Sequence, residues 1–407
     1  MITRRSLLGG LAAGAATASG FALAGRASGT PATAPAGSAR PAGSARPARS
    51  AGPARSAGMP LHIINNSGEY ANASVWIYLV GNDGTQQVHV TPDGELRPVA
   101  LADNGPDGFT DYAIPLAASG TTTLQLPRMS GRIYTALGDK LKFKAVQDGN
   151  GKAALAYPAG WVAGDPNYDV LHDCAEFTFT AGGMYCNTTM VDMFSVPLSL
   201  TLSGAKEQTT GTLKDGARAT VFSAVKAAEG FDRLVVGDKR VIAPGHGLDS
   251  GLFAQDYLAP AIDEAWSAYT AKDLTVTTDA GTFTGRVSGG RLTFTGPRSV
   301  SFDKPTTRDV LFCDGALAAP NDGTTGPVAA VLGAALNRST LTAQDHQPTT
   351  DPAAFYQQRL TNHYARELHA ATKDGKAYGF AFDDVAGFAS YIEDSAPREI
   401  TLTLTPF

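Results

Sequence analysis

Apolar and polar residues alternate with a period of two along several short segments in the first half of the chain. These segments lie at residues 61–64, 75–80, 121–126, 132–137 and 140–145. Glycine, proline and serine residues separate them, which is typical of strands joined by short turns. Residues 131–134 and 140–143 are expected to pair as a β-hairpin, because Leu141 and Phe143 alternate with lysines after a Gly-Asp turn. The pattern predicts a β-sandwich or β-barrel over about residues 60–205.

The pattern changes after about residue 205. Apolar residues follow helical spacing over residues 253–269, although Pro260 is placed to divide that helix. Two further helices are expected at 328–336 and 353–371, the second with Asp351 as its N-cap. Strands are expected between these helices, at residues 274–278, 282–287 and 291–295. This region therefore predicts a mixed α/β arrangement.

A last alternating segment, residues 399–405, is expected to form a strand that returns to the first β region. The predicted fold class is mainly β with α+β character. Residues 60–205 and 396–407 would form a β-barrel or sandwich domain, and residues 206–395 a mixed α/β domain.

The N-terminus has the features of an export signal. Arg4 and Arg5 precede an Ala/Gly-rich apolar stretch and small residues that suit signal cleavage, so residues 1–29 predict a twin-arginine signal peptide. Residues 30–59 are rich in Pro, Ala, Gly and Ser and predict a disordered linker. A secreted protein follows from this interpretation. No apolar run after the signal reaches the roughly 18 residues needed to span a membrane.

Charge is unevenly distributed along the chain. The first 59 residues hold seven arginines and no acidic residue, which leaves 26 basic and 38 acidic residues, a formal charge of −12, for the rest. Such an acidic body disfavours nucleic acid as a partner and is compatible with a neutral polysaccharide.

Several kinds of site are not expected from the sequence. Three cysteines, at spacings that fit no zinc site, are too few for a disulfide scaffold, although a bridge between Cys174 and Cys186 is possible after export. The glycine-rich segment 245–251 lacks the last glycine of a dinucleotide loop and is interpreted as a turn or groove edge. His363 and His369, six residues apart, are interpreted as surface or packing residues. No metal or cofactor is expected.

A pair of acidic residues, Glu176 and Asp192, lies in a strand context that suits carbohydrate chemistry. The positions expected on one face of a hairpin carry polar and aromatic side chains: Glu176, Thr178, Thr180, Tyr185, Asn187 and Thr189. If the turn centres on Gly182 and Gly183, Glu176 lies opposite Thr189 and roughly 11 Å from Asp192 between Cα atoms.

Strict alternation would place Asp192 on the other face of the hairpin, so a bulge or strand end is needed to bring it round. The carboxyl groups of Glu176 and Asp192 could then lie ~6.5–9.5 Å apart, the spacing of inverting glycosidases. The alternative interpretation is a solvated strand edge, since acidic residues are common.

The motif Glu-Phe-Thr-Phe-Thr, a Gly turn and Tyr-x-Asn-x-Thr-x-Val-Asp, over residues 176–192, resembles glycoside hydrolase family 64. Further segments similar to this family lie at residues 60–66, 130–134 and 375–385. The resemblance covers nearly all of residues 60–407. It implies an endo-β-1,3-glucanase, in which a thaumatin-like β-barrel domain and a mixed α/β domain flank a wide groove. A monomer is expected.

By this resemblance Glu176 is the general acid and Asp192 the general base of an inverting hydrolysis, with laminaripentaose as the expected product. Laminarin, curdlan and fungal wall glucan are the expected substrates. Groove-lining positions of the family fall on Thr178, Thr180, Tyr185 and Thr189, of which Thr180 and Tyr185 are looser matches. Two alternatives stay open: a non-catalytic thaumatin-like glucan-binding protein, and a hydrolase of another β-glucan.

Other residues are assigned with less support from the pattern. Trp161 could stack on a sugar ring or pack in the protein, whereas Trp76 is expected in the core. Asp383 and Asp384 could rim the groove, but a capping or loop role is favoured for them. Asp165 and Asp173 are also expected in loops.

Overall fold

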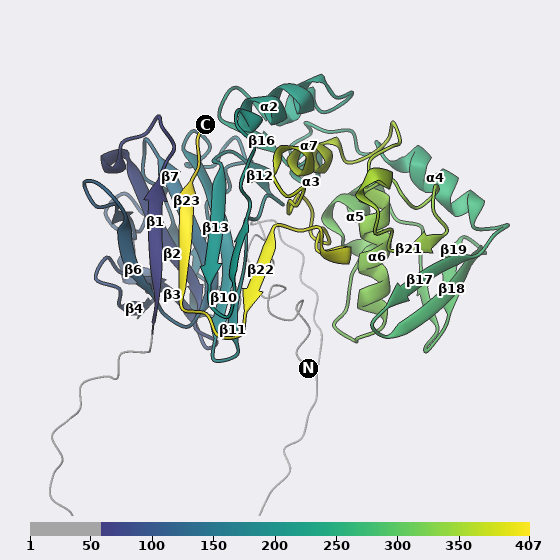
Figure 1. Cartoon of the computed structure of the whole chain (residues 1–407), viewed down its shortest axis with the longest axis horizontal. Helices are drawn as coiled ribbons and strands as arrows, with labels where there is room; N and C mark the ends of the chain where they lie inside the picture. The colour runs from purple at the N-terminus through teal and green to yellow at the C-terminus, as the bar shows by residue number, and fades with distance from the viewer. Residues whose placement is uncertain (1–57) are drawn as a thin grey trace, which may run out of the picture.

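The computed structural model describes residues 58–407, which are mainly strands with some helices, arranged in several sheets. The predicted signal peptide and nearly all of the predicted linker lie outside the described residues. Figure 1 shows two packed sheets at one end of the molecule and a second group of strands and helices at the other. No helix among residues 58–407 is long and apolar enough to cross a membrane.

Two large sheets form the first region. The five-stranded sheet has the order β14-β13-β23-β1-β6, and the longer sheet the order β22-β11-β10-β7-β2-β3-β4, with β5 beside β2. The strands of the first sheet are β1 (Met59–Asn65), β6 (Thr122–Leu126), β13 (Leu198–Ser203), β14 (Glu207–Thr210) and β23 (Glu399–Leu404). Those of the second are β2 (Val75–Asn82), β3 (Gln87–Val90), β4 (Leu96–Pro98), β5 (Ile114–Pro115), β7 (Ser130–Leu137), β10 (Leu171–Thr180), β11 (Gly183–Asn187) and β22 (Tyr391–Asp394).

The inward side chains of both sheets share one apolar core. It includes Leu61 of β1, Ile77 of β2, Ile133 of β7 and Leu402 of β23, all fully or nearly fully buried. Two layers with alternate residues facing a common core form a β-sandwich. Within residues 58–407, no strand pairing joins the edges of these sheets into a closed barrel.

The C-terminal strand returns to the first sheet as predicted. β23 lies between β1 and β13, parallel to β1 with Leu61 opposite Ile400 and antiparallel to β13. β22, which precedes it, extends the second sheet beside β11. The chain therefore re-enters the sandwich at Tyr391, a few residues earlier than the alternating pattern indicates.

The second region combines helices with smaller sheets. The helices are α2 (Ala217–Ala227), α3 (Pro244–Asp249), α4 (Ala259–Ala268), α5 (Thr307–Phe312), α6 (Thr325–Asn337) and α7 (His363–Ala371). The strands are β12 (Met193–Phe194), β15 (Val235–Val236) and β16 (Arg240–Ile242) in one sheet, and β17 (Leu274–Thr278), β18 (Gly281–Ser288), β19 (Arg291–Thr295), β20 (Val300–Phe302) and β21 (His346–Gln347) in another. β8 (Lys144–Gln147) and β9 (Ala153–Ala156) form a separate pair beside the sandwich.

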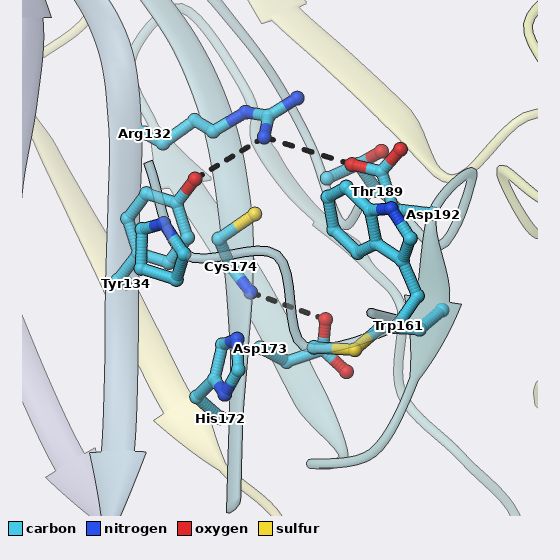
Figure 2. A pocket seen from close by; sticks show the side chains of 10 residues that line it. Arg132, Tyr134, Trp161, His172, Asp173, Cys174, Thr189 and Asp192 are labelled. Atoms are coloured by element: carbon cyan, nitrogen blue, oxygen red, sulfur yellow. Dashed lines mark hydrogen bonds and ion pairs between the residues drawn. The ribbon is translucent and has the colours of Figure 1, made fainter. Parts of the chain in front are cut away.

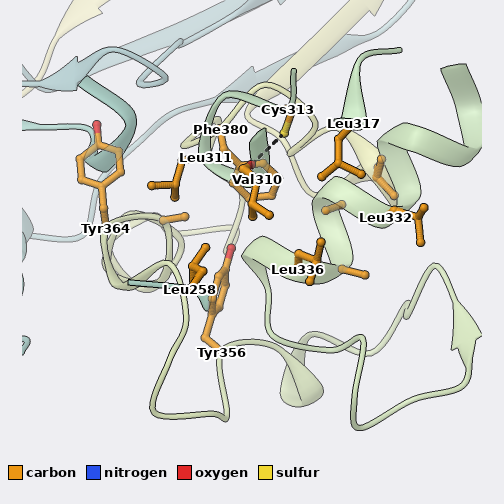
Figure 3. Close-up of a cluster of buried hydrophobic side chains, with 14 of the residues drawn as sticks. Leu258, Val310, Leu311, Cys313, Leu317, Leu332, Leu336, Tyr356, Tyr364 and Phe380 are labelled. Carbon is orange, nitrogen blue, oxygen red and sulfur yellow. Dashed lines mark hydrogen bonds between the residues drawn. The ribbon is translucent and has the colours of Figure 1, made fainter. Parts of the chain in front are cut away.

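Helix α6 is the centre of the second core. It is apolar around its whole circumference, which is typical of a helix surrounded by protein, and nearly all its residues are buried. Figure 3 shows Leu332 and Leu336 of α6 in a cluster with Val310, Leu317 and Phe380. The predicted helix at 328–336 is thus confirmed, with bounds of 325–337.

The predicted hairpin of residues 131–134 with 140–143 is wrong. β7 pairs instead with β2 and β10, while Phe143 forms only an isolated bridge with Thr110. The central position of β7 gives its apolar face more burial than a local hairpin would, and two-stranded hairpins are marginal by themselves.

Two predicted helices are shorter than their periodicity indicates. The helix expected at 253–269 begins at Ala259, because Pro260 occupies the first turn, where its missing N–H costs nothing. The helix expected at 353–371 begins at His363, with Asn362 as N-cap. Asp351 caps a separate single 3₁₀ turn, η6 (Pro352–Ala354). Other 3₁₀ turns are η2 (Asn72–Ser74), η3 (Leu101–Asp103), η4 (Asp232–Leu234), η5 (Gly315–Leu317) and η7 (Val385–Gly387).

Candidate active site

The acidic motif forms the predicted hairpin of β10 and β11, with a register two residues away from the expected one. Glu176 lies opposite Asn187, and Thr180 lies opposite Gly183, so Ala181 and Gly182 form the two-residue loop. Gly183 is therefore the first residue of β11. At this position β22 leaves no room for a side chain, because a Cβ would lie 2.4 Å from the Asp394 carbonyl oxygen. A shift of two residues keeps every side chain on its predicted face.

Arg132 of β7 is the direct cross-strand neighbour of Glu176. Its Nε and Nη2 atoms donate hydrogen bonds to Glu176 Oε1 at 3.1 and 2.9 Å, and Nη1 donates to the Tyr134 hydroxyl at 3.2 Å. Asn187 Nδ2 donates to the other carboxylate oxygen, Oε2, at 3.4 Å. The Glu176 carboxylate is therefore held by Arg132 and Asn187, and its side chain, 15% exposed, still reaches solvent.

Asp192 approaches Arg132 from outside the ladder. β11 ends at Asn187, so the chain leaves the sheet there, and this strand end allows Asp192 to reach the hairpin face that carries Glu176. Asp192 Oδ2 lies 3.6 Å from Arg132 Nη1, and Oδ1 accepts a hydrogen bond from His246 Nε2 at 2.8 Å. Figure 2 shows the Asp192 carboxylate facing the Arg132 guanidinium.

The Asp192 carboxylate is stabilised as an anion. Burial alone would raise its pKa, but the hydrogen bond from His246 and the positive charge of Arg132 outweigh burial. The pKa of Asp192 therefore lies below its usual value. A carboxylate of this kind is suited to accept a proton from water at neutral pH.

The shared arginine limits the distance between Glu176 and Asp192. Nη2 is 2.9 Å from Glu176 Oε1 and Nη1 is 3.6 Å from Asp192 Oδ2. The two terminal nitrogens of a planar guanidinium are only about 2.3 Å apart, so Glu176 Oε1 and Asp192 Oδ2 are at most roughly 9 Å apart. This limit admits both the ~6.5–9.5 Å spacing of inverting glycosidases and the ~5–5.5 Å spacing of retaining ones.

The predicted sugar-binding residues of the hairpin divide into two groups. Thr178 and Asn187 are fully buried, and Thr189 is 6% exposed. Thr180 and Tyr185 are half-buried and reach the surface. The Thr178 and Thr189 hydroxyls and the Asn187 side-chain oxygen have no hydrogen-bond partner. Thr178 and Asn187 are thus covered, although they alternate on the same hairpin face as Thr180 and Tyr185.

Trp161 lies near Asp192 on the loop that follows β9. Its ring stacks on His246 at 4.4 Å between centroids, and both Trp161 and Asp192 line a depression of about 300 Å³ (Figure 2). This loop lies close to the sheet at Gly160, where a Cβ would lie 2.1 Å from Arg240 Nη1 and 2.6 Å from His172 Cε1. Buried Arg240 also donates a hydrogen bond to the Gly160 carbonyl oxygen at 2.7 Å.

Asp173 and the cysteines differ from expectation. Asp173 is buried in β10 rather than in a loop, where it accepts hydrogen bonds from the backbone N–H groups of Ser195 and Val196. Burial raises its pKa to about 7 despite these bonds. Cys174 and Cys186 are both free and buried, so the possible bridge between them is absent; Cys186 pairs with Phe177 in the ladder instead.

A second charged cluster, made of Arg338, His369 and Asp383, is buried in the α/β region. His369 Nε2 lies 3.0 Å from both carboxylate oxygens of Asp383, and Arg338 Nη2 donates to Asp383 Oδ1 at 3.0 Å. Asp383 was expected to lie in a loop or cap a helix and His369 to be a surface or packing residue; both interpretations miss this ion pair. Asp165 does lie in a loop.

His246 and Arg132 are the site residues that the sequence analysis did not assign. Arg132 lies within a segment already noted for its strand pattern, and His246 lies in the glycine-rich segment 245–251, which is helix α3 rather than a turn. The glycine-rich composition of that segment is the only signal that marked it. Groups of three or more His, Cys, Asp or Glu side chains able to hold a metal ion are absent from residues 58–407.

Comparison with known proteins gives matches over nearly the whole described region. The model of glycoside hydrolase family 64, described as "Beta-1,3-glucanase", matches residues 57–404. A glucan endo-1,3-beta-glucosidase of Cellulosimicrobium cellulans is 34% identical over 371 residues, which cover 86% of this chain. The match spans only 65% of that relative's own length.

Two crystal structures are similar in fold. A laminaripentaose-producing β-1,3-glucanase in complex with laminaritetraose has a TM-score of 0.78 and 37% identity, covering 86% of this chain and 99% of that one. A family 64 β-1,3-glucanase domain from Clostridium beijerinckii has a TM-score of 0.76 and 28% identity, covering 88% and 100%.

Proposed function

Because this chain belongs to glycoside hydrolase family 64, we propose that it is a secreted endo-β-1,3-glucanase acting on laminarin, curdlan and fungal wall glucan. Laminaripentaose is the proposed main product, since a structural relative at 37% identity is a laminaripentaose-producing enzyme. We also propose that the protein is exported by the twin-arginine route and is a monomer.

The observation that carries this proposal is the convergence of Glu176 and Asp192 on Arg132. Two carboxylates in different surroundings, both reaching solvent, are what glycoside hydrolysis needs. Glu176 is the general acid. Its Oε1 atom accepts both bonds from Arg132, which leaves Oε2 to carry the proton that passes to the glycosidic oxygen.

Asp192 is the general base. Its ionised carboxylate removes a proton from a water molecule as the water oxygen attacks the anomeric carbon and the glycosidic bond breaks. The water attacks from the face opposite the leaving group, so the configuration at the anomeric carbon inverts. After product release Glu176 regains a proton and Asp192 loses one.

The glucan chain would lie in a wide groove between the thaumatin-like β-sandwich and the α/β region. Trp161, Thr180 and Tyr185, which reach the surface, would contact sugar rings and hydroxyl groups. Thr178, Asn187 and Thr189 would bind sugar after a side-chain movement, because each has one buried polar atom without a hydrogen-bond partner.

The test compares the purified wild type with Glu176→Gln and Asp192→Asn on linear β-1,3-glucan, with the products separated by chromatography. Each substitution preserves side-chain size, and each should lower turnover by at least ~10²-fold, the usual contribution of a positioned acid or base. Glu207→Gln, at an exposed position on β14, is the matched control and should retain full activity.

Two outcomes would contradict the proposal. A wild type that binds curdlan without releasing reducing sugar would be a non-catalytic glucan-binding protein. A wild type that cleaves β-1,4- or mixed-linkage glucan better than β-1,3-glucan would have another substrate. Separately, near-wild-type turnover in Glu176→Gln or Asp192→Asn would show that the substituted residue is not the proposed acid or base.

A further inference from the structure

His246 has a place in the site that the acid–base pair alone does not explain. It lies on the short helix α3, and its ring is held between two aromatic side chains. Trp161 stacks on one side at 4.4 Å with an interplanar angle of 22°, and the Phe312 ring meets it edge-on at 5.5 Å. The side chain is 15% exposed. These contacts leave the imidazole little freedom to rotate.

The imidazole is aimed at one oxygen of Asp192. His246 Nε2 lies 2.8 Å from Asp192 Oδ1, whereas the other oxygen, Oδ2, has only Arg132 Nη1 at 3.6 Å. The backbone of the same aspartate is also tied to this element, because Ala243, at the start of α3, donates its N–H to the Asp192 carbonyl oxygen at 3.1 Å. The two oxygens of the carboxylate are therefore not equivalent.

We propose that His246 is a positioning residue for the general base, and that Asp192 Oδ2 is the oxygen that takes the proton from water. The inference rests on the proposed function. His246 Nε2–H donates to Oδ1 throughout the reaction and transfers no proton. The water O–H bond breaks, its proton moves to Oδ2, and the water oxygen bonds to the anomeric carbon as Glu176 protonates the leaving oxygen.

The physical need for such a residue follows from the geometry of a carboxylate. The terminal torsion of an aspartate is broad, so a carboxylate without a fixed partner samples many orientations. A general base must lie within hydrogen-bond reach of the water it activates. Misplacement by about 1 Å can cost ~10²-fold in rate, which gives a positioning residue a large effect without contact with substrate.

The test uses two substitutions that separate the hydrogen bond from the stacking. His246→Phe keeps a flat ring between Trp161 and Phe312 and removes the donor. His246→Gln loses the ring but carries an amide N–H at about the position of Nε2. His346→Phe is the matched control, because His346 forms a surface pair with Asp345 at 2.9 Å and its side chain is 79% exposed.

We expect His246→Phe to lower kcat at least about tenfold with KM within about twofold of wild type, because the base is displaced and the substrate contacts are not. His246→Gln should recover part of that loss. The acid limb of the kcat–pH profile should move to higher pH in His246→Phe, since the anion loses a hydrogen bond that favours it. His346→Phe should change none of these quantities.

Retention of wild-type kcat by His246→Phe would overturn the inference, and so would an equal loss in His246→Phe and His246→Gln with no change in the pH profile. If His246→Phe does not fold, His246→Asn takes its place, because its shorter amide cannot reach Oδ1. An inactive wild type, or a fully active Asp192→Asn, would instead reject the proposed function, so the two failures are distinguishable.

Discussion

Arg132 on β7 donates two hydrogen bonds to one carboxylate oxygen of Glu176, its direct neighbour on β10. The same guanidinium lies 3.6 Å from Asp192, so one cation is placed between the two proposed catalytic carboxylates. Its positive charge helps to lower the pKa of Asp192 below the usual value. Because Arg132 is fixed by the sheet, the position of Glu176 is set by strand register rather than by a loop.

The first prediction concerns the anomeric configuration of the product. If water attacks with Asp192 as base, hydrolysis of a β-1,3 linkage should release an α-configured reducing end first. A retaining enzyme would give the β-anomer through a covalent intermediate. Proton NMR of the anomeric signals in the first minutes, before mutarotation, measures the difference. Early accumulation of the β-anomer would contradict both inversion and the role of Asp192.

The second prediction concerns the loop that carries Trp161. A methyl group at Gly160 would lie 2.1 Å from Arg240 Nη1, and buried Arg240 is hydrogen-bonded to two backbone carbonyl oxygens, so the loop must move instead. Gly160→Ala should therefore displace Trp161 from His246 and reduce kcat/KM about tenfold or more.

Gly164, in the same loop, supplies the control for this change. A Cβ at Gly164 would have no atom within 4 Å, so Gly164→Ala should keep wild-type activity. Initial rates on laminarin and melting temperatures of both variants make the comparison. Equal activity of Gly160→Ala and Gly164→Ala would show that the loop position does not matter for catalysis.

The third prediction concerns stability at alkaline pH. Burial alone would lower the pKa of His369, but the Asp383 carboxylate and the Gly375 carbonyl oxygen favour the imidazolium more strongly, so its pKa lies above the usual value. A raised folded-state pKa contributes stability that is fully present below the unfolded pKa of about 6.5 and is lost as pH rises through the folded pKa.

His369→Gln removes this titration and leaves a neutral amide. Between about pH 6 and pH 9 the melting temperature of the wild type should fall by at least about 2 °C more than that of His369→Gln. Differential scanning calorimetry of both proteins in matched buffers gives the two curves. Parallel curves would mean that His369 is not charged in the folded protein.

The fourth prediction concerns export. If Arg4 and Arg5 direct the chain to the twin-arginine route, replacing both with lysine should abolish secretion of active enzyme and leave folded, active protein in the cytoplasm. Activity assays of the culture medium and the cell lysate measure the distribution. Undiminished secretion of the double variant would reject this route.

Local patterns predicted much of the sandwich and the acidic hairpin. The predicted strands at 75–80 and 399–405 are present, and the motif from Glu176 to Asn187 forms the predicted hairpin. These predictions succeed because side-chain alternation is a local property of the sequence. The hairpin register was wrong by two residues. Its cause is the close passage of β22 at Gly183, a contact between segments more than 200 residues apart.

Contacts between distant segments also explain the site residues that were missed. His246 reaches Asp192 across 54 residues of sequence, and no spacing rule links a histidine on a short helix to a strand-end carboxylate. Likewise, Asp383 does lie in a turn, as expected, but its contact with His369 depends on the position of α7 and could not be predicted from local sequence. Patterns along the chain identified the carboxylates, but the groups that orient them come from other elements.

The place of β23 in the first sheet has a consequence for how the protein is made. β1 and β13 flank a strand that is synthesised after both of them, so neither can complete its ladder until residues 399–404 have emerged from the ribosome. Until then both strands present open edges, which readily pair with other chains. Translation that stops before residue 399 should therefore yield aggregating protein rather than a smaller enzyme.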